Sequence, residues 1–349
     1  MVTACLTREV SMRRAAALLA IPAIASVAIA GCSSSPSSTS SKPASSSASA
    51  SGSPSASASA TGPTVASNSV VTASGAFGKA PTVTIPSEKA ASTLFTKTLI
   101  QGTGATMTTS DSLVGNFVLY DWSGTTHKLL GSTYSSGSPT LFSSSLLPGL
   151  QKALIGQKTG SRVLAVIPPA DGFGSAGNSQ IGVSPTDTLV FVVDMIQDIG
   201  NKAGVTGTQS SNGGGALPTV TAATGKAPTI TIPANNPPKT LQVKTLIKGT
   251  GAKVTKGQLI VVQYTGVIWR TKKVFDSSWS RSEPFGVNIG EGQVIKGWDT
   301  GLVGQTVGSR VLLVIPPVDG YGASGSSGAG IKGTDTIVFV VDIIAAAGS

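Results

Sequence analysis

The residue types that usually carry acid–base, nucleophilic or metal chemistry are scarce in this chain. His127 is the only histidine, and it lies in a polar stretch typical of a surface loop. The two cysteines, Cys5 and Cys32, lie near the N-terminus, so the body of the chain has no disulfide framework and no cysteine metal site. No paired carboxylates and no Ser-His-Asp arrangement are evident. The sequence offers no convincing nucleophile, and we expect neither a metal nor a cofactor.

Two glycine-rich runs, residues 172–177 and 320–325, fit the dinucleotide-binding pattern G-x-G-x-x-G. Each follows an expected strand, but a Pro-Pro pair intervenes and no helix follows, so we expect these glycines only to let a loop turn. The net charge is +10, and the lysines that contribute to it are spread out with no aromatic residues between them. We therefore expect a solvated basic surface and no nucleic-acid partner.

Aromatic and polar residues gather in the second half of the chain, from Val261 to Trp298 and again near the C-terminus. Judged singly, each has a structural explanation. Phe285 and Phe339 would be core residues of a small β-rich domain, and Trp298 would pack from an apolar helix face. Asp276, within an Asp-Ser-Ser run, would form a turn. Only their joint order and spacing carry a functional argument.

The elements that must position these residues occur twice. Residues 308–322 repeat residues 160–174 with twelve of fifteen positions identical. Three further pairs of segments match in the same order: 78–86 with 225–233, 97–100 with 244–247, and 186–194 with 334–342. Between the two modules, residues 200–224 are rich in Gly, Ser and Thr, which is typical of a flexible linker.

Most of these elements are expected to be strands. The second module has four strand-like runs, at Leu241–Ile247, Leu259–Ile268, Val311–Ile315 and Thr336–Ile344. Helical spacing occurs in one segment, at Val294, Ile295, Trp298 and Leu302. An antiparallel sheet with one short helix packed across it would bury both apolar faces, so we expect an α+β fold.

An ordered set of motifs in the second module resembles the FKBP-type peptidyl-prolyl cis-trans isomerases. The motifs are VQYTG at 262–266, FDSS at 275–278, PF at 284–285, QVIKGW at 293–298, and the stretches 316–325 and 338–339. The resemblance covers about residues 241–344, nearly a whole domain of that family. It implies two FKBP-like domains, each an antiparallel five-stranded sheet wrapped around a short helix, with an aromatic pocket between sheet and helix.

The resemblance also implies roles for individual residues. Those implied to be catalytic are Tyr264, Phe275, Asp276, Ile295 and Tyr321. Those implied to bind substrate are Arg281, Phe285, Gln293, Val294, Trp298, Ile331 and Phe339. The backbone N–H of Ile295 and the hydroxyl of Tyr321 would hold substrate carbonyls. Trp298 would pack against the proline ring, and Asp276 would meet the twisted amide electrostatically.

Such a pocket suits a reaction that needs no nucleophile. An X-Pro amide rotates slowly because twisting its C–N bond breaks conjugation, at a cost of ~18–20 kcal/mol. The twisted state is less dipolar than the planar amide, so a dry apolar pocket disfavours the planar ground state more than the twisted one. A barrier lowered by ~4–6 kcal/mol would accelerate rotation roughly a thousandfold or more.

The first module keeps the strands and the Pro-Pro turn but lacks these side chains. Its counterparts of Phe275, Asp276, Phe285, Trp298 and Tyr321 are Leu130, Gly131, Thr140, Leu150 and Phe173, and Tyr264 falls near Val118 or Leu119. We therefore expect little or no isomerase activity from the first module. A spacer, a chaperone-like surface or a contact for the second module would each be compatible with these changes.

The N-terminus predicts export. Arg13 and Arg14 precede an apolar run, residues 15–30, that is too short for a comfortable membrane span and is typical of a signal peptide. The following Ile-Ala-Gly-Cys resembles a bacterial lipobox, which implies cleavage before Cys32 and attachment of a diacylglyceryl group to its sulfur. An ordinary signal peptide with a chance cysteine is the alternative.

These observations predict five segments. They are a signal peptide at 1–31, a lipidated Cys32 with a disordered Ser/Ala-rich tether at 32–77, a degenerate FKBP-like domain at 78–199, the linker at 200–224, and an FKBP-type isomerase domain at 225–349. The protein would be anchored to the outer face of the bacterial cytoplasmic membrane.

The leading hypothesis is an exported isomerase that assists the folding of extracytoplasmic proteins. Its partners would be proline-containing segments of those proteins, the lipid bilayer through Cys32 and, as the resemblance implies, the macrolides tacrolimus and rapamycin. The alternative is a non-catalytic peptide-binding or chaperone-like scaffold lipoprotein that uses the same pocket. The pocket residues of the second module favour the isomerase, whereas the altered first module shows that the alternative is available to this chain.

Overall fold

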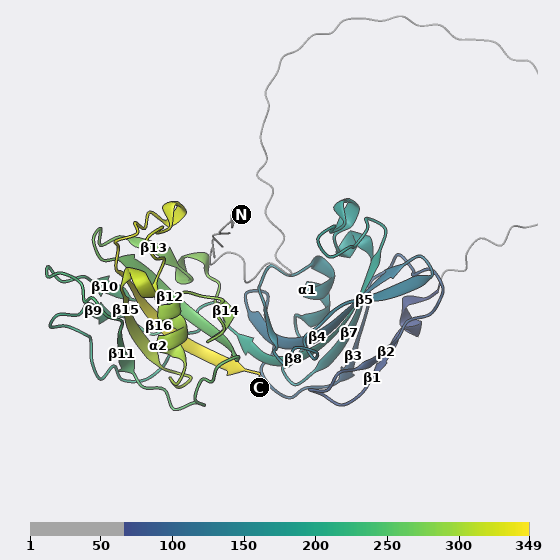
Figure 1. Cartoon of the computed structure of the whole chain (residues 1–349). Helices are drawn as coiled ribbons and strands as arrows, with labels where there is room; N and C mark the ends of the chain where they lie inside the picture. Colours follow the sequence, from purple (N-terminus) through teal and green to yellow (C-terminus); the bar gives the residue numbers. More distant parts are fainter. Residues whose placement is uncertain (1–65, 349) are drawn as a thin grey trace, which may run out of the picture.

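The computed structural model describes residues 66–348, so the expected signal peptide, Cys32 and most of the tether lie outside the described residues. Two modules of the same topology lie side by side (Figure 1). Each is an antiparallel sheet with one short α-helix against one face, which confirms the α+β class. Within residues 66–348, no helix has both the length and the apolar character needed to cross a membrane.

The sheet of the first module has the strand order β3-β7-β8-β4-β5, and β6 pairs with β4 beside this path. The strands are β3 (Phe95–Ile100), β4 (Ser112–Ser123), β5 (Thr126–Ser132), β6 (Thr140–Phe142), β7 (Arg162–Ile167) and β8 (Thr188–Ile199). β7 is buried along its whole length, because successive side chains point to opposite faces and both faces are covered.

The second module repeats this order as β11-β15-β16-β12-β13, with β14 paired to β12. Its strands are β11 (Gln242–Ile247), β12 (Leu259–Ile268), β13 (Val274–Ser277), β14 (Phe285–Asn288), β15 (Arg310–Ile315) and β16 (Ile337–Ala347). Each sheet has six strands where five were expected. The sixth is possible because β12 pairs with β14 through its first four residues and with β13 through Thr265–Val267.

One short α-helix packs against the inner face of each sheet, α1 (Pro148–Leu154) and α2 (Lys296–Leu302). α2 begins later than the helical spacing suggested, because Ile295 is extended (φ −61°, ψ 146°) and caps the helix. Trp298 and Leu302 on its inner face are fully buried. Short 3₁₀ helices form at η1 (Asn68–Val70), η2 (Pro169–Asp171), η3 (Gly174–Ala176), η4 (Trp279–Arg281), η5 (Pro317–Asp319) and η6 (Ser327–Ala329).

A two-stranded hairpin covers the outer face of each sheet, and the sequence did not predict it. Hairpin β1 (Thr72–Ser74)–β2 (Thr82–Thr84) packs on the first sheet, and β9 (Thr219–Thr221)–β10 (Thr229–Thr231) packs on the second. Part of the expected tether and part of the expected linker are therefore strand. Both were read as unstructured because of their Ser, Thr and Gly content, yet each places a valine, Val71 or Val220, in an apolar cluster.

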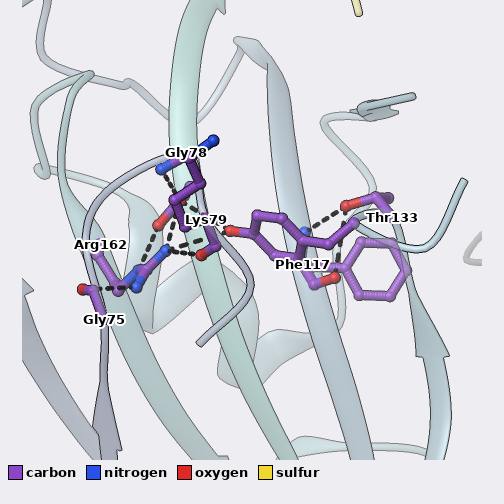
Figure 2. Close-up of polar contacts among 8 residues, drawn as sticks. Gly75, Gly78, Lys79, Phe117, Thr133 and Arg162 are labelled. Carbon is purple, nitrogen blue, oxygen red and sulfur yellow. Dashed lines mark hydrogen bonds and ion pairs between the residues drawn. The ribbon is translucent and has the colours of Figure 1, made fainter. Parts of the chain in front are cut away.

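A buried ion pair fastens the first hairpin to its sheet (Figure 2). Arg162 Nε donates to Asp194 Oδ1 over 2.6 Å. The same guanidinium reaches the hairpin backbone, donating to the carbonyl oxygens of Gly75 at 2.8 Å and Lys79 at 2.6 Å. The N–H of Gly78 donates to Asp194 Oδ2 at 2.7 Å. Both charges thus have several partners, which an ion pair withdrawn from water requires.

The two modules contact each other through an apolar cluster. Its buried members come from β4, β8, β12 and β16: Val114, Ile199, Leu259, Val261 and Ala345. Beside it Leu141 of β6 packs on Gly286 of β14, where an added Cβ would lie only 2.8 Å from the Leu141 Cβ. Asn288 Nδ2 also donates to Ser138 Oγ over 2.9 Å. The interface is therefore closely packed.

The patches that meet in this interface are equivalent parts of the two modules. Val114 faces Leu141 in the β4–β6 pairing, and Val261 faces Gly286 in the β12–β14 pairing. Each valine is followed by a register shift against the long C-terminal strand of its module. The modules thus present the same sheet edge to each other, as the halves of an isologous dimer do.

Candidate active site

An aromatic cluster lies between the sheet and the helix of the second module. Trp298 of α2 packs edge-on against Tyr264 of β12 and Phe339 of β16, with ring centroids 5.3 and 5.2 Å apart. Phe285 of β14 lies 6.2 Å from the Trp298 ring, and Phe275 of β13 lies 5.4 Å from that of Phe339. Trp298 and Phe339 have no exposed surface, so the rings that a ligand can reach are those packed above them.

Three polar side chains meet at the edge of this cluster. The Tyr264 hydroxyl donates to Asp276 Oδ2 at 2.5 Å and accepts from Arg281 Nη2 at 2.8 Å. Arg281 also forms an ion pair with Asp276, and its guanidinium carbon lies 5.6 Å from the Tyr264 ring centroid. Burial and the hydrogen bond to Asp276 raise the pKa of the Tyr264 hydroxyl well above its ordinary value. Tyr264 therefore stays protonated and holds Asp276 in place.

Two further donors near the cluster have no acceptor among residues 66–348. The Tyr321 hydroxyl makes no hydrogen bond there, and burial with the nearby Asp276 charge raises the pKa of Tyr321 to about 12. Ile295 is the N-cap residue of α2, so its N–H lies at the helix start, where amides lack intrahelical acceptors. Both groups are neutral donors at physiological pH, suited to bind carbonyl oxygens.

The site opens into a cleft of about 1050 Å³ between the two modules. On the second module, the cleft is lined by Leu259, Tyr264, Phe275, Asp276, Arg281, Glu283, Pro284, Phe285, Gly286, Val287, Asn288, Gln293, Tyr321, Ser326, Gly328 and Ala329. On the first module, it is lined by Phe117, Leu119, Leu130, Gly131, Ser132, Thr133, Ser136, Ser138, Pro139, Thr140, Leu141, Ser143, Ser145 and Ile181. We call this space the shared cleft.

The structure brings most of the expected site residues together. Seven of them line the shared cleft: Tyr264, Phe275, Asp276, Arg281, Phe285, Gln293 and Tyr321. Four lie behind these in the core, with 6% exposure or less: Val294, Trp298, Ile331 and Phe339. Tyr264 belongs to the same core and is only 2% exposed. Ile295 is half-buried against the same core. Trp298 thus supports the exposed rings from below, and the expected lipidation site, Cys32, lies outside the described residues.

Sequence reasoning missed the lining residues that come from the first module. It also misplaced the counterpart of Tyr264, which is Phe117 and not Val118 or Leu119. Phe117 pairs with Val193 as Tyr264 pairs with Val341. The N–H of Phe117 donates to Thr133 Oγ1 at 2.9 Å (Figure 2), as that of Tyr264 donates to a serine hydroxyl at 2.8 Å. The signal available in the sequence was Trp122, which aligns with Trp269 and fixes this register.

The first module therefore keeps an aromatic ring at this position but not the polar set. Gly131 and Ser136 stand where the second module has Asp276 and Arg281, so nothing there can form the carboxylate–guanidinium pair. Within residues 66–348 no group of three or more His, Cys, Asp or Glu side chains is placed to hold a metal ion. The arrangement in the second module supplies an apolar surface, neutral donors and one fixed carboxylate.

Comparison with known proteins agrees with this geometry. The family model described as FKBP-type peptidyl-prolyl cis-trans isomerase matches residues 109–196 and 250–344, one match in each module. The chain is 40% identical to an FK506-binding protein of Streptomyces anulatus over 118 residues, which are 34% of this chain and 95% of that protein. It is 39% identical to a probable FK506-binding protein of Corynebacterium glutamicum over 121 residues, 34% of this chain and 98% of that protein.

A solved structure is also similar. The crystal structure of AtFKBP13 shares 35% sequence identity, covers 31% of this chain and 93% of its own, and superposes with a TM-score of 0.29.

Proposed function

This chain belongs to the FKBP-type peptidyl-prolyl cis-trans isomerase family, and from that premise we propose that its activity resides in the second module alone. One observation carries the proposal. The second module joins Tyr264, Asp276 and Arg281 in one hydrogen-bonded group above the Trp298 cluster. The first module has the same backbone but lacks the carboxylate, the guanidinium and the indole at these positions.

Catalysis would follow from the environment of the bound amide. Phe275 and Phe285, packed on the buried Tyr264 and Trp298, offer apolar surface that displaces water from the prolyl bond, so the less dipolar twisted amide is favoured over the planar one. The N–H of Ile295 and the hydroxyl of Tyr321 would hold the flanking carbonyls and fix the twist. Asp276, held by Tyr264 and Arg281, would orient the amide whose carbonyl has rotated out of conjugation.

The test is an isomerisation assay of the full chain on a short prolyl peptide. We expect Asp276→Ala and Trp298→Leu each to lower kcat/KM about tenfold or more, which corresponds to ~1.4 kcal/mol of transition-state stabilisation. The matched control is Asp171→Ala, which removes a carboxylate from a surface ion pair of the first module. It should leave kcat/KM unchanged.

A non-catalytic peptide-binding scaffold is the second candidate, because the first module lines the cleft without the catalytic set. The same assay separates the two candidates. If the wild type and the folded Asp276→Ala and Trp298→Leu variants all isomerise the peptide no faster than the uncatalysed rate, only the binding function survives. If all three are equally active above that rate, the activity does not come from the site in the second module.

We also propose that the second module binds the macrolides tacrolimus and rapamycin. The proposal is supported by the relatives named FK506-binding proteins and by the exposed rings beside the free Tyr321 and Ile295 donors. A titration followed by thermal unfolding should show a concentration-dependent rise in the unfolding temperature, as a ligand specific to the folded state requires. An unchanged unfolding temperature at saturating macrolide would exclude this ligand.

Export and lipid anchoring through Cys32 form a separate proposal, supported by the Arg pair, the apolar run and the Ile-Ala-Gly-Cys sequence. In a bacterial host, the full chain should take up a labelled fatty acid and sediment with membranes. Cys32→Ala should abolish both. Membrane sedimentation that persists without label in the variant would contradict attachment at this cysteine.

A further inference from the structure

The shared cleft has two walls built from equivalent positions of the two modules. Tyr264 on one wall corresponds to Phe117 on the other, and Phe275 corresponds to Leu130. This follows from the way the modules meet, because equivalent sheet edges face each other and each pocket mouth opens toward its counterpart. The pocket of the first module is therefore part of the same space as the candidate active site.

The two walls differ in charge. The second-module wall carries Asp276, Arg281 and Glu283, whereas no lysine, arginine, aspartate or glutamate of the first module lines the cleft. The first-module wall instead offers half-buried apolar side chains, Leu130 and Ile181 among them, framed by serine and threonine hydroxyls. Such a surface fits an uncharged, largely apolar stretch of polypeptide whose backbone amides can bond to hydroxyls.

The cleft is also larger than one prolyl residue needs. Its volume of about 1050 Å³ lies just above the ~300–1,000 Å³ usual for pockets that hold a whole small ligand. The apolar interface cluster and the hydrogen bond between Asn288 and Ser138 hold the two walls together. The first-module wall is thus in place before a ligand arrives, and binding to it costs little ordering.

We propose that the first module binds the part of a client chain that flanks the proline held by the second module, and that it selects uncharged, apolar flanking residues. This inference rests on the proposed function of the second module, since it places the proline there. The substrate class is then an unfolded polypeptide several residues longer than a prolyl dipeptide. Binding of the flank adds to transition-state stabilisation of long substrates and gives nothing to short ones.

The experiment compares two substrates in the full chain. One is a prolyl tetrapeptide, and the other is a peptide of about fifteen residues with leucine and alanine on both sides of the same prolyl bond. We expect the long peptide to have the higher kcat/KM, by roughly five- to tenfold if one or two side chains are buried. Replacing the flanking leucines with glutamate should remove this advantage, because the first-module wall has no cation to pair with them.

Two variants locate the effect in the first module. Leu130→Ser removes an apolar lining side chain, and Ser145→Trp fills the cleft from an exposed position without touching the core. Both should lower the ratio of long-peptide to short-peptide kcat/KM toward one. The matched control is Leu129→Ser, because Leu129 is 49% exposed and does not line the cleft. It should leave the ratio at the wild-type value.

Fluorescence anisotropy of the labelled long peptide separates this inference from the proposed function. If the wild type isomerises neither peptide but binds the long one, and both lining variants weaken that binding, the proposed function fails and the first-module site stands. If both lining variants keep the wild-type affinity and the wild-type ratio, the first module does not contact the client and the inference is overturned.

Discussion

Tyr264 and Phe117 occupy the same position in the two modules and differ by one oxygen atom. That oxygen links the carboxylate of Asp276 to the guanidinium of Arg281. Where it is missing, in the first module, the carboxylate and the guanidinium are missing too, and a glycine and a serine replace them. The three groups thus form one hydrogen-bonded unit, in which the half-buried Asp276 carboxylate takes donors from both Tyr264 and Arg281.

Tyr264→Phe tests the unit directly. We expect kcat/KM on a short prolyl peptide to fall roughly three- to tenfold, because Asp276 loses a donor that fixes its position, and the free energy of unfolding to fall by ~1–2 kcal/mol. Tyr134→Phe is the matched control, since the Tyr134 hydroxyl also donates to a carboxylate, Asp194, at 2.7 Å. The control should lose similar stability but no activity. Equal activity losses in both variants would mean that Tyr264 acts only through stability.

The sequence indicated which residues lie at the site, but it did not indicate how deeply each of them is buried. The resemblance carried by the motifs around Asp276 and Tyr321 placed both residues at the shared cleft, where the structure has them. Asp276 lies in strand β13 and not in the turn that its Asp-Ser-Ser run suggested when judged alone. Trp298 and Phe339 were assigned to the same surface but lie wholly beneath it. Spacing reports which face of an element a side chain occupies, and it does not report which neighbouring ring covers that side chain.

At the scale of elements, the two hairpins change how the modules are stabilised. Residues 66–77 and 217–224 were read as parts of a tether and a linker. Together with the residues that follow them, up to 85 and 232, they cover apolar outer faces of β7 and β8 and of β15 and β16. Their sequences gave little warning because each contributes only a few apolar residues among Thr, Gly and Pro. Tertiary contacts hold the hairpins in place. Both hairpins pack in apolar clusters on their sheets, and in the first module Arg162, paired with Asp194, also binds the hairpin backbone.

Arg162→Ala should release the first hairpin. The substitution leaves Asp194 buried without its cation, so we expect the free energy of unfolding of the first module to fall by ~3–5 kcal/mol. Hydrogen exchange should show the amides of Thr82–Thr84 exchanging faster. The equivalent change Arg310→Ala, which breaks the second module's buried pair with Asp342, should leave those amides unaffected. Unchanged protection in Arg162→Ala would show that apolar packing alone holds the hairpin.

A carboxylate near the start of the last strand has different neighbours in the two modules, and the stability of each module therefore depends on pH in the opposite direction. Burial and the neighbouring Asp187 raise the pKa of Asp121 to about 6. In the second module the equivalent of Asp187 is Asp335, which binds Arg270 at 2.8 Å, and that hydrogen bond lowers the pKa of Asp335. A raised carboxyl pKa stabilises the folded state below about pH 4, and this contribution is lost as the pH rises through about 6.

Asp121→Asn should therefore raise the free energy of unfolding of the first module by about 1–2 kcal/mol at pH 7.5, which corresponds to a rise of a few degrees in its unfolding temperature. At pH 4 the substitution should change the unfolding temperature little. Asp335→Asn should lower the unfolding temperature of the second module at pH 7.5, because it removes a carboxylate that is stabilised in its charged form. Thermal unfolding of both variants at the two pH values checks the signs. A loss of stability at pH 7.5 in Asp121→Asn would contradict the assignment.

For the whole molecule, the contact between the modules was beyond sequence reasoning. Val114 and Val261 lie in strands whose neighbouring apolar residues pack in the core of their own module. The sequence pattern does not show that these two side chains instead contact the other module. The linker composition even favoured independent movement. The structure places both pockets in one cleft instead, so the first module is part of the site's surroundings.

Val114→Asp should separate the modules, because it places an unpaired charge in the interface cluster. Small-angle scattering should record a larger radius of gyration, while the two modules keep their own sheets. Val70→Asp, at a position that is already 49% exposed, is the control and should leave the radius unchanged. An unaltered radius for Val114→Asp would mean that the cluster does not hold the modules together.

Cutting the chain between its halves would not yield a simple monomer. The freed half would carry Leu259, Val261 and Ala345 on an uncovered edge, which in the intact chain packs against the equivalent edge of the first module. We expect two such fragments to associate through these apolar edges. Their packing would be looser than in the intact chain, because Gly286 would face a second Gly286 where it now packs against Leu141. Any study of the isolated fragment has to treat its association state as concentration-dependent before its rates are compared with those of the intact protein.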